Sequence, residues 1–273
     1  KGVLFATEFG FALLGCYLPF TFKKCQDFFD TKSWQSDLRK LRRGGELKSN
    51  DRLRISFAYL FRIKVDDKYL LVLNNRGTQK YQPVGGAYQF NEEEKIYLSN
   101  KFKFSDDEKI KRDELSRNDY RLNVPVKYIR KFIKRFDKTD NREGVNDLSR
   151  EFKEELIRTG IIDFKNIKYR YCGRHFSKIQ YSRHFNCYEL LLADIVELEL
   201  TDEQCYKLRS LMEKKSKLYR FISSKEIKSC GIYEGTNKLI ESIGDHTIKI
   251  LQETEDELLR VKGSLKSYTI SLK

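Results

Sequence analysis

Alternating hydrophobic and polar positions mark a pair of strands near residue 60. Residues 54–65 read RISFAYLFRIKV and residues 68–74 read KYLLVLN. Both segments are rich in β-branched and aromatic side chains, and the Asp-Asp pair at 66–67 is typical of a turn between strands. The pattern therefore predicts a β-hairpin. Similar apolar runs at residues 167–171 and 187–200 predict further strands.

Helical spacing of apolar residues predicts three helices. Pro125 precedes a basic segment, VKYIRKFIKRF at 126–136, in which apolar residues recur every three or four positions. Residues 201–215 open with Thr-Asp-Glu-Gln, a pattern that favours a helix start, and residues 236–251 predict a closing helix. Strands interleaved with helices indicate a mixed α/β fold.

Residues 3–22 form the longest apolar stretch and carry one charge, Glu8. Twenty helical residues span about 30 Å, which matches the hydrocarbon core of a bilayer. The lysines at 23 and 24 favour a cytoplasmic position for the chain that follows. We therefore expect a membrane helix within residues 1–24. A buried or interfacial helix is the alternative, because Glu8 and Pro19 interrupt the stretch.

Shifts in composition divide the rest of the chain into segments. Residues 25–50 are a basic connector with a short helix ended by a Gly-Gly pair. Residues 51–251 carry the predicted strands and helices of one domain. Within them, residues 91–123 are highly charged and are expected to be an inserted, mostly exposed segment. Residues 252–273 are expected to be a frayed or weakly docked tail.

The charge balance points to an anionic partner. The chain has 54 Lys and Arg residues against 40 Asp and Glu, a net charge of +14. Nucleic acid, a small nucleotide and an acidic membrane leaflet all fit, and a merely solvated basic surface is the alternative. The six cysteines form no Cys-x-x-Cys pair, which excludes a zinc site or disulfide framework of the usual spacing and fits a reducing compartment. Cys172 near His175 is a weaker candidate for a nucleophile and base.

Three carboxylates gather on the segment Arg150-Glu151-Phe152-Lys153-Glu154-Glu155-Leu156. On a helix, Glu151, Glu154 and Glu155 fall within an arc of roughly 100°, and the apolar residues occupy the neighbouring arc. Like charges on adjacent turns repel unless a cation lies among them, and both Arg150 and a bound Mg²⁺ would supply one. Such a cluster suits a site that handles phosphoanhydrides. A solvated amphipathic face is the alternative.

Other motifs place this helix in a known context. Residues 81–86 (YQPVGG) form a Pro-x-Gly-Gly turn after an apolar strand, and Glu143 lies seven residues before Arg150. The set resembles the Nudix box, a glycine followed by a glutamate and an Arg-Glu-x-x-Glu-Glu helix that binds a metal-diphosphate. The departures from the box are Ile157 in place of a glycine, Glu143 one residue nearer to the arginine, and 63 residues between Gly86 and Arg150. These departures alter the loops that shape the pocket.

We expect Gly85, Gly86 and Arg76 to contact the nucleotide, because glycines permit a close backbone approach. A simple turn is the alternative for the glycine pair. Arg76 lies in the turn that leads toward these glycines.

A longer resemblance extends over about residues 50–251. Its motifs are RISFAYLFRI, KYLLVLNNRG, YQPVGG, the Asp-Tyr-Arg-Leu-x-Val-Pro run ending at Pro125, REGVNDLSREFKEEL and ELLLADIVEL. Together they resemble the SMODS-associated Nudix domains, which accompany bacterial cyclic-oligonucleotide antiphage (CBASS) operons. The resemblance implies an α/β/α sandwich with a mixed sheet. It also implies a membrane-anchored effector at the bacterial inner membrane, which senses a cyclic oligonucleotide in its cytoplasmic domain and disrupts the membrane.

The main alternative is a Mg²⁺-dependent hydrolase of nucleoside diphosphate derivatives. In that interpretation Arg150 orients the glutamates, Glu151 and Glu155 ligate the metal, and Glu154 or Glu143 helps to activate water. In the sensor interpretation Glu151, Glu154 and Glu155 hold a metal or serve mainly as structure. A weaker third hypothesis is a nucleic-acid-binding module. The sequence is compatible with both a monomer and a homo-oligomer. Without a membrane span at 3–22, the chain would be cytoplasmic.

Overall fold

The computed structural model describes residues 33–74, 78–107, 109, 117–232, 242–261 and 263–272. The expected membrane segment at 3–22 and the candidate residue Arg76 lie outside these ranges. Within them, none of the helices combines the length and the apolar character that a bilayer crossing requires.

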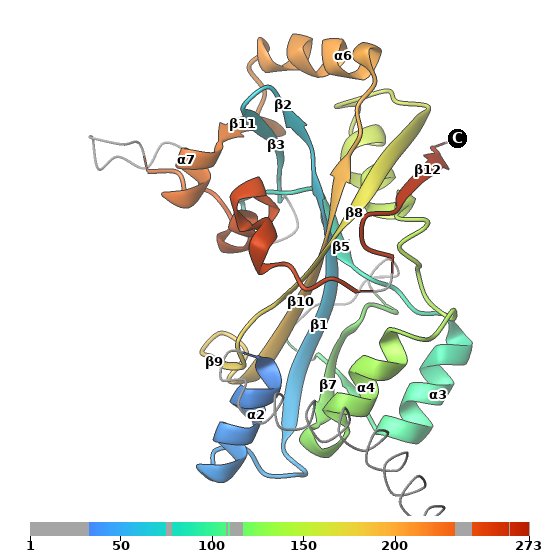
Figure 1. Ribbon diagram of the computed structural model, residues 1–273, viewed down its shortest axis with the longest axis vertical. Helices are drawn as coiled ribbons and strands as arrows, with labels where there is room; N and C mark the ends of the chain where they lie inside the picture. The colour runs from blue at the N-terminus through green and yellow to red at the C-terminus, as the bar shows by residue number, and fades with distance from the viewer. Residues whose placement is uncertain are drawn as a thin grey trace, which may run out of the picture.

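A long strand, β1 (Arg52–Arg62), forms the centre of an eight-stranded mixed sheet. Along one side it pairs in parallel with β10 (Cys187–Leu198). Along the other side, its first half pairs antiparallel with β7 (Arg121–Pro125) and its second half with β5 (Gly85–Ala87). β1 therefore runs through the middle of the molecule (Figure 1) and carries β5 on its second half. The predicted mixed α/β fold with a mixed sheet is confirmed.

The outer strands complete this sheet. β8 (Asn166–Phe176) pairs with β10, and β12 (Ser267–Ser271) lies outside β8. On the opposite edge, β6 (Ser105–Asp106) pairs with β7. On the β8 side, β9 (Gln180–Ser182) forms a hairpin with the start of β10. The predicted strands at 167–171 and 187–200 are thus confirmed as β8 and β10.

The predicted hairpin forms, but it belongs to a second, four-stranded sheet. β2 (Lys64–Val65) pairs with β3 (Lys68–Leu73) across the predicted turn, where Asp66 has a φ of 52°. β4 (Tyr81–Gln82) and β11 (Tyr219–Ser223) pair with β3. Strand β1 ends at Arg62, so the chain passes from the first sheet into the second within one apolar run.

Side chains of β1 alternate between two cores, one on each face of the main sheet. Phe57, Tyr59 and Phe61 face one core, while Leu60 faces the other. On the first face, Phe57 stacks on Phe136 with ring centroids 3.9 Å apart. That face is covered by α3 (Glu92–Phe102), α4 (Ile129–Phe136) after a 3-10 turn (Val126–Tyr128), and α5 (Ser149–Phe152). The basic amphipathic helix at 126–136 is therefore confirmed.

The second core lies between the main sheet, the second sheet and short helices. It includes α7 (Ser224–Lys228) and the 3-10 helix Asp245–Ile250, which is followed by a second 3-10 helix, Gln252–Glu257. The predicted closing helix at 236–251 is corrected for its described part, because residues 245–250 are a 3-10 helix and not an α-helix. Arg62, which is fully buried, holds this segment through the carbonyl oxygens of Ile250 (2.5 Å) and Leu251 (3.1 Å).

Two further predicted helices, one in the connector and one after β10, are confirmed. α2 (Trp34–Arg43) ends at the Gly-Gly pair, and its Trp34 ring stacks on Phe176 at 6.1 Å. α6 (Asp202–Met212) begins with a capping box between Thr201 and Gln204. The capping box satisfies backbone N–H groups at the helix start, which explains why the Thr-Asp-Glu-Gln pattern was informative.

Two segments are more integrated than the sequence predicts. Residues 91–123, expected to be mostly exposed, contribute α3, β6 and the start of β7, and the carboxylate of Glu94 is buried against Arg135. The tail at 252–273, expected to be frayed or weakly docked, is docked through β12, which pairs with β8 and buries Ile270 and Leu272. Charge alone did not reveal these elements, since their partners lie far away in the sequence.

Candidate functional site

The glycine turn and the carboxylate segment meet in space despite the 63 residues between them. β5 places Gly86 opposite Tyr59 of β1 and Gly85 opposite Leu60. The Gly85 amide donates a hydrogen bond to Glu155 Oε2 at 3.0 Å. A Cβ atom at Gly86 would lie 2.0 Å from Glu151 Oε1, so only a glycine leaves room for this carboxylate. Gly85 and Gly86 therefore lie beside the predicted carboxylates.

The carboxylate segment is helical, but its second half is wider than an α-helix. α5 covers Ser149–Phe152 and continues as a π-helix over Lys153–Ile157, in which Arg158 N–H donates to Lys153 O at 2.8 Å. Phe152 and Leu156 are fully buried, as the apolar spacing predicts. Single π-turns inside helices are frequent at functional sites, and this one carries Glu154 and Glu155.

Arg150 lies among the glutamates, as expected for a counter-charge. Its guanidinium donates to Glu143 through Nε (2.6 Å) and Nη2 (3.2 Å), to Glu151 through Nη1 (2.7 Å), and to the Ala87 carbonyl (2.7 Å). Glu154 lies 4.0 Å away. Burial opposes the charge, but the hydrogen bond to Glu143 and the charge of Glu151 outweigh it and raise the pKa of Arg150. One side chain thus joins β5, the Glu143 loop and α5.

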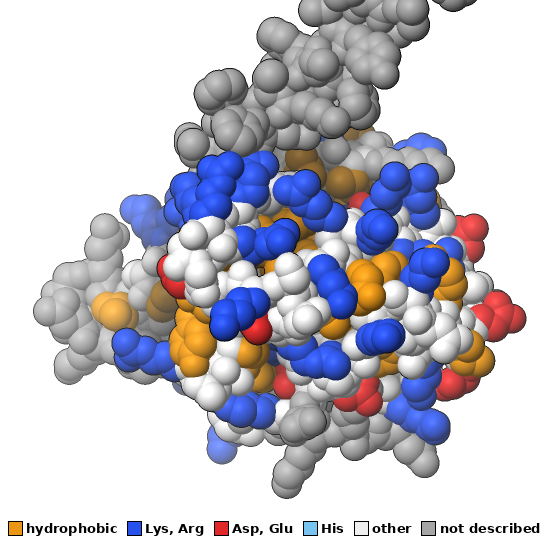
Figure 2. Space-filling model, turned by 90° about the horizontal axis from the view of Figure 1, so that it is seen from below, with side chains coloured by type: hydrophobic (Ala, Val, Ile, Leu, Met, Phe, Trp, Pro, Cys, Tyr) orange, Lys and Arg blue, Asp and Glu red, His pale blue; other side chains and the backbone are white. Residues whose placement is uncertain are grey.

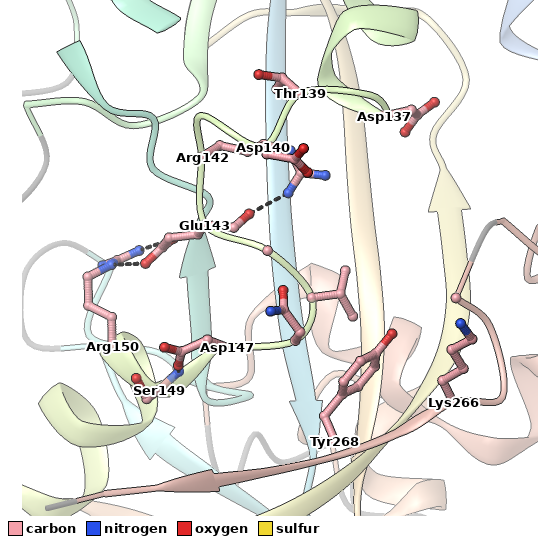
Figure 3. Close-up of a pocket in the computed structure, with 14 residues that line it drawn as sticks. Asp137, Thr139, Asp140, Arg142, Glu143, Asp147, Ser149, Arg150, Lys266 and Tyr268 are labelled. Carbon is pink, nitrogen blue, oxygen red and sulfur yellow. Dashed lines mark hydrogen bonds and ion pairs between the residues drawn. The ribbon is translucent and has the colours of Figure 1, made fainter. Parts of the chain in front are cut away.

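Glu143 lines a pocket of about 650 Å³, which is in the volume range of ligand sites. Its Oε2 also accepts a hydrogen bond from the Gln89 amide at 2.9 Å, which fixes the loop before α5. In Figure 3, Glu143 and Arg150 form one side of the pocket, while Tyr268 and Lys266 lie across from them. Glu151, Glu154 and Glu155 are not among its lining residues. The lining residues are Asp137, Thr139, Asp140, Arg142, Glu143, Gly144, Val145, Asn146, Asp147, Ser149, Arg150, Gly263, Lys266 and Tyr268.

Asp119 is a carboxylate of the site that sequence reasoning missed. It is almost fully buried, accepts a hydrogen bond from Gln89 Nε2 at 3.1 Å and lies 3.5 Å from Arg121. Burial raises its pKa to about 6, against the opposing charge of Arg121. A carboxyl group with such a pKa can exchange protons near neutral pH. The only sequence signal was its position at the start of the Asp-Tyr-Arg-Leu-x-Val-Pro run.

A second missed group is the hydroxyl of Tyr59. It is fully buried and has no hydrogen-bond partner, although it lies in the electrostatic field of Glu143, Arg150 and Glu151. Burial, reinforced by the Glu143 charge, raises the pKa of Tyr59, so the hydroxyl stays protonated.

The donor set of the carboxylate segment fits Mg²⁺, which prefers carboxylate oxygens. Glu151 and Glu155 already accept hydrogen bonds from Arg150 and Gly85, but a carboxylate accepts at both oxygens, so these contacts leave coordination open. Elsewhere in the described ranges, Cys172, Glu197 and Glu255 bring three ligand atoms within 4.8 Å. That group surrounds the Arg62 guanidinium, which supplies its countercharge.

The weaker nucleophile candidate is part of the second core. Burial raises the pKa of Cys172 and lowers that of His175. The His175 ring nitrogen Nε2 lies 3.2 Å from the Lys249 carbonyl oxygen. The neutral thiol favours a structural role.

Comparison with known families adds one result. The family model of the SMODS-associated NUDIX domain matches residues 52–251, which includes the glycine turn and the whole carboxylate segment. The match ends before Gly263, Lys266 and Tyr268. No curated protein matches the chain.

Proposed function

We propose, because the chain belongs to the family of SMODS-associated NUDIX domains, that it is an antiphage defence effector whose NUDIX domain binds a cyclic oligonucleotide. The family ties the domain to SMODS, a component of antiphage systems, and suggests a nucleotide-type ligand. The observation that carries the proposal is the 650 Å³ pocket beside the Glu143–Arg150 ion pair. Its volume suits a nucleotide, and its lining combines charged, polar and aromatic side chains.

The hydrogen bonds of Arg150 favour ligand sensing over catalytic turnover. Arg150 engages Glu143, Glu151 and a backbone carbonyl at once, so its charge is committed to the protein. This arrangement would therefore serve as a rigid wall for a ligand. A ligand bound at this wall would affect β5 and α5 together, because Arg150 of α5 donates a hydrogen bond to the Ala87 carbonyl of β5.

NUDIX domains generally use divalent metals such as Mg²⁺. In this chain Glu151, Glu154 and Glu155 would hold the ion, and it would supply positive charge to the phosphates of the ligand. Gly85 and Gly86 keep the backbone close to these carboxylates.

The output would be delivered at the bacterial inner membrane. Residues 3–22 carry a single charge and are long enough to span a bilayer as a helix. Figure 2 shows one end of the molecule, where Lys and Arg side chains predominate over Asp and Glu. α2 and α4, which lie at that end in Figure 1, carry exposed cations that include Lys40, Arg130 and Lys131. These cations suit anionic lipid headgroups.

A Mg²⁺-dependent hydrolase is the second candidate function. Its supporting observation is Asp119, whose pKa of about 6 suits proton transfer beside the intact Arg-Glu-x-x-Glu-Glu segment. Arg150 would orient the glutamates, and Glu143 or Glu154 would position the attacking water.

The two functions are separated by one experiment on the purified full chain. The protein is incubated with Mg²⁺ and a panel of cyclic di- and trinucleotides and nucleoside diphosphate derivatives. Equilibrium dialysis measures bound ligand, and chromatography identifies the nucleotide that is recovered. A cyclic nucleotide retained and returned intact supports the sensor, while a linear product with turnover supports the hydrolase.

The carboxylate assignment is tested with a double variant in the same assay. Glu154→Gln with Glu155→Gln should weaken Mg²⁺-dependent binding at least tenfold, because two oxygen ligands lose their charge. Glu203→Gln on α6, an exposed glutamate paired with Lys207, is the matched control. Unchanged Mg²⁺ affinity in the double variant would contradict the metal assignment.

A further inference from the structure

The far wall of the pocket is built by residues beyond the family match. The turn at 263–266 is fixed to β8 by two backbone hydrogen bonds, from Tyr171 N–H to Lys266 O (2.9 Å) and from Leu265 N–H to Tyr171 O (2.6 Å). β12 then pairs with β8 over residues 267–271. These hydrogen bonds hold the backbone of the wall against β8. The position of the wall in the pocket is therefore set by the sheet.

Tyr268 presents an aromatic ring from this wall. Its ring is half-buried and lies 5.9 Å from the fully buried Tyr169 ring, at an angle of 39°. The Tyr268 hydroxyl lies near Gly263, where an added Cβ would come within 3.3 Å of it. The contact with Tyr169 orients the ring, and Figure 3 shows Tyr268 on the side of the pocket across from Glu143 and Arg150. An aromatic ring fixed in this way is a stacking platform for a nucleobase.

Lys266 adds a positive charge beside this ring. Its ammonium group is exposed and makes no hydrogen bond or ion pair within the described part of the chain. The opposite wall carries both carboxylates, such as Asp140 and Asp147, and the guanidinium groups of Arg142 and Arg150, which already donate to protein acceptors. Lys266 therefore offers an ammonium group that a phosphate can pair with.

We propose that residues 263–268, outside the family-matched region, form a nucleotide subsite in which Tyr268 stacks on the base and Lys266 binds a phosphate. The inference rests on the proposed function, since it assigns a nucleotide to the same pocket. It adds that ligand selection depends on the C-terminal segment, which lies beyond the family-matched residues 52–251.

The test measures binding of five probes to the full chain by equilibrium dialysis: AMP, GMP, cyclic di-AMP, cyclic di-GMP and ribose 5-phosphate. Tyr268→Leu should weaken binding of the base-containing probes by about 5- to 100-fold, the range expected for one base–aromatic stack. Ribose 5-phosphate, which has no base, should bind the variant as it binds the wild type. Tyr268→Phe keeps the ring and should stay within about twofold of the wild type.

The lysine is tested with the same probes. Lys266→Gln should weaken all of them about 3- to 10-fold and should reduce the salt dependence of binding, since one charge contact is removed. The matched controls are Tyr206→Leu, at an exposed tyrosine of α6, and Lys215→Gln, at an exposed lysine outside the pocket lining. Melting temperatures establish that each variant is folded.

The outcomes separate this inference from the function on which it rests. Nucleotide binding that is unchanged in both Tyr268→Leu and Lys266→Gln would overturn the subsite and leave the sensor function standing. Equal weakening of ribose 5-phosphate and AMP by Tyr268→Leu would overturn the stacking role. If the wild type retains none of the five probes, the subsite fails, and the proposed function is decided separately by the panel that includes cyclic trinucleotides.

Discussion

Arg150 organises the site through the shape of its side chain. A guanidinium presents five N–H donors in a planar fork, and here they reach two carboxylates and one backbone carbonyl. A lysine at this position would carry the charge but could not span the same acceptors. The pairing also orients the Glu143 carboxylate within a partly buried wall. Geometry, more than net charge, is therefore the reason for an arginine here.

Asp119 should make the stability of the protein depend on pH. Burial raises the pKa of Asp119 to about 6 from an ordinary value of 3.8. An acid whose pKa rises on folding favours the folded state when it is protonated. Its destabilising effect therefore appears as the pH rises from about 4 through 6. At pH 8 the effect is about 3 kcal/mol, since one pKa unit corresponds to about 1.4 kcal/mol.

The variant Asp119→Asn removes this titration. We expect it to exceed the wild type in free energy of unfolding by about 1 to 3 kcal/mol at pH 8, and to match it near pH 4. Urea denaturation across this pH range measures the difference. Asp140→Asn, at an exposed aspartate of the pocket rim, should show no such trend. A difference between Asp119→Asn and wild type that is constant with pH would contradict the raised pKa.

Sequence motifs identified the residues that act through local spacing. Arg150, Glu151, Glu154 and Glu155 lie on one segment, so their proximity follows from helical periodicity alone. Asp119 and Tyr59 reach the same region through strand pairing, and no local pattern encodes that pairing. Burial, which gives Asp119 its unusual pKa, is also a property of the folded chain.

At the scale of elements, strand β5 determines how closely the glycine turn approaches the carboxylates. A Cβ atom at Gly85 would lie 2.1 Å from the Tyr59 carbonyl oxygen, and the φ angle of Gly85 is +149°. Gly85→Ala should therefore lower the free energy of unfolding by about 3 kcal/mol or more, because backbone must move. In Gly86→Ala, the added Cβ meets the Glu151 carboxylate, which is the end of a side chain and can shift more easily than backbone. This variant should lower the free energy of unfolding by about 1 to 2 kcal/mol.

Gly160→Ala is the matched control for these variants. Gly160 also has a positive φ, +71°, but a Cβ there would meet nothing within 4 Å. Its expected loss is about 1 kcal/mol, from backbone strain alone. Chemical denaturation gives all three values. If Gly85→Ala were as mild as Gly160→Ala, the close contact between β5 and β1 would be contradicted.

Elements with strong local signals were predictable, and elements that depend on distant partners were not. The hairpin at 64–73, the helix at 129–136 and the capped helix at 202–212 each carry a complete local pattern. β12 was missed because its short sequence, SYTIS, gains its hydrogen bonds from β8. The π-turn at 153–157 was missed because its apolar spacing also fits an α-helix.

At the scale of the molecule, one end of the main sheet carries a basic surface. α6 lies at one end in Figure 1, and α2 and α4 lie at the other, where Figure 2 shows the predominance of Lys and Arg. The basic end belongs to the connector and to the helix after β7, so it forms from segments far apart in the sequence. Its charge was predictable from composition, but its concentration at one end was not.

This basic end should bind anionic membranes. A basic residue near an anionic surface contributes about 1 kcal/mol, so replacing Lys40, Arg130 and Lys131 with glutamine should weaken vesicle binding about 100-fold at low salt. Sedimentation with phosphatidylcholine vesicles, with and without phosphatidylglycerol, measures this effect.

The matched control removes three positive charges at the opposite end of the molecule. Lys214, Lys215 and Lys217 are exposed in or beside the segment that follows α6. Their replacement with glutamine should leave vesicle binding within about threefold of the wild type, because these charges lie at the end of the molecule opposite α2 and α4. At high salt concentration, the wild type and the two triple variants should bind vesicles with similar, weak affinity. Equal weakening by both triple variants at low salt would mean that only net charge matters, and the basic end would lose its role as the membrane-facing surface.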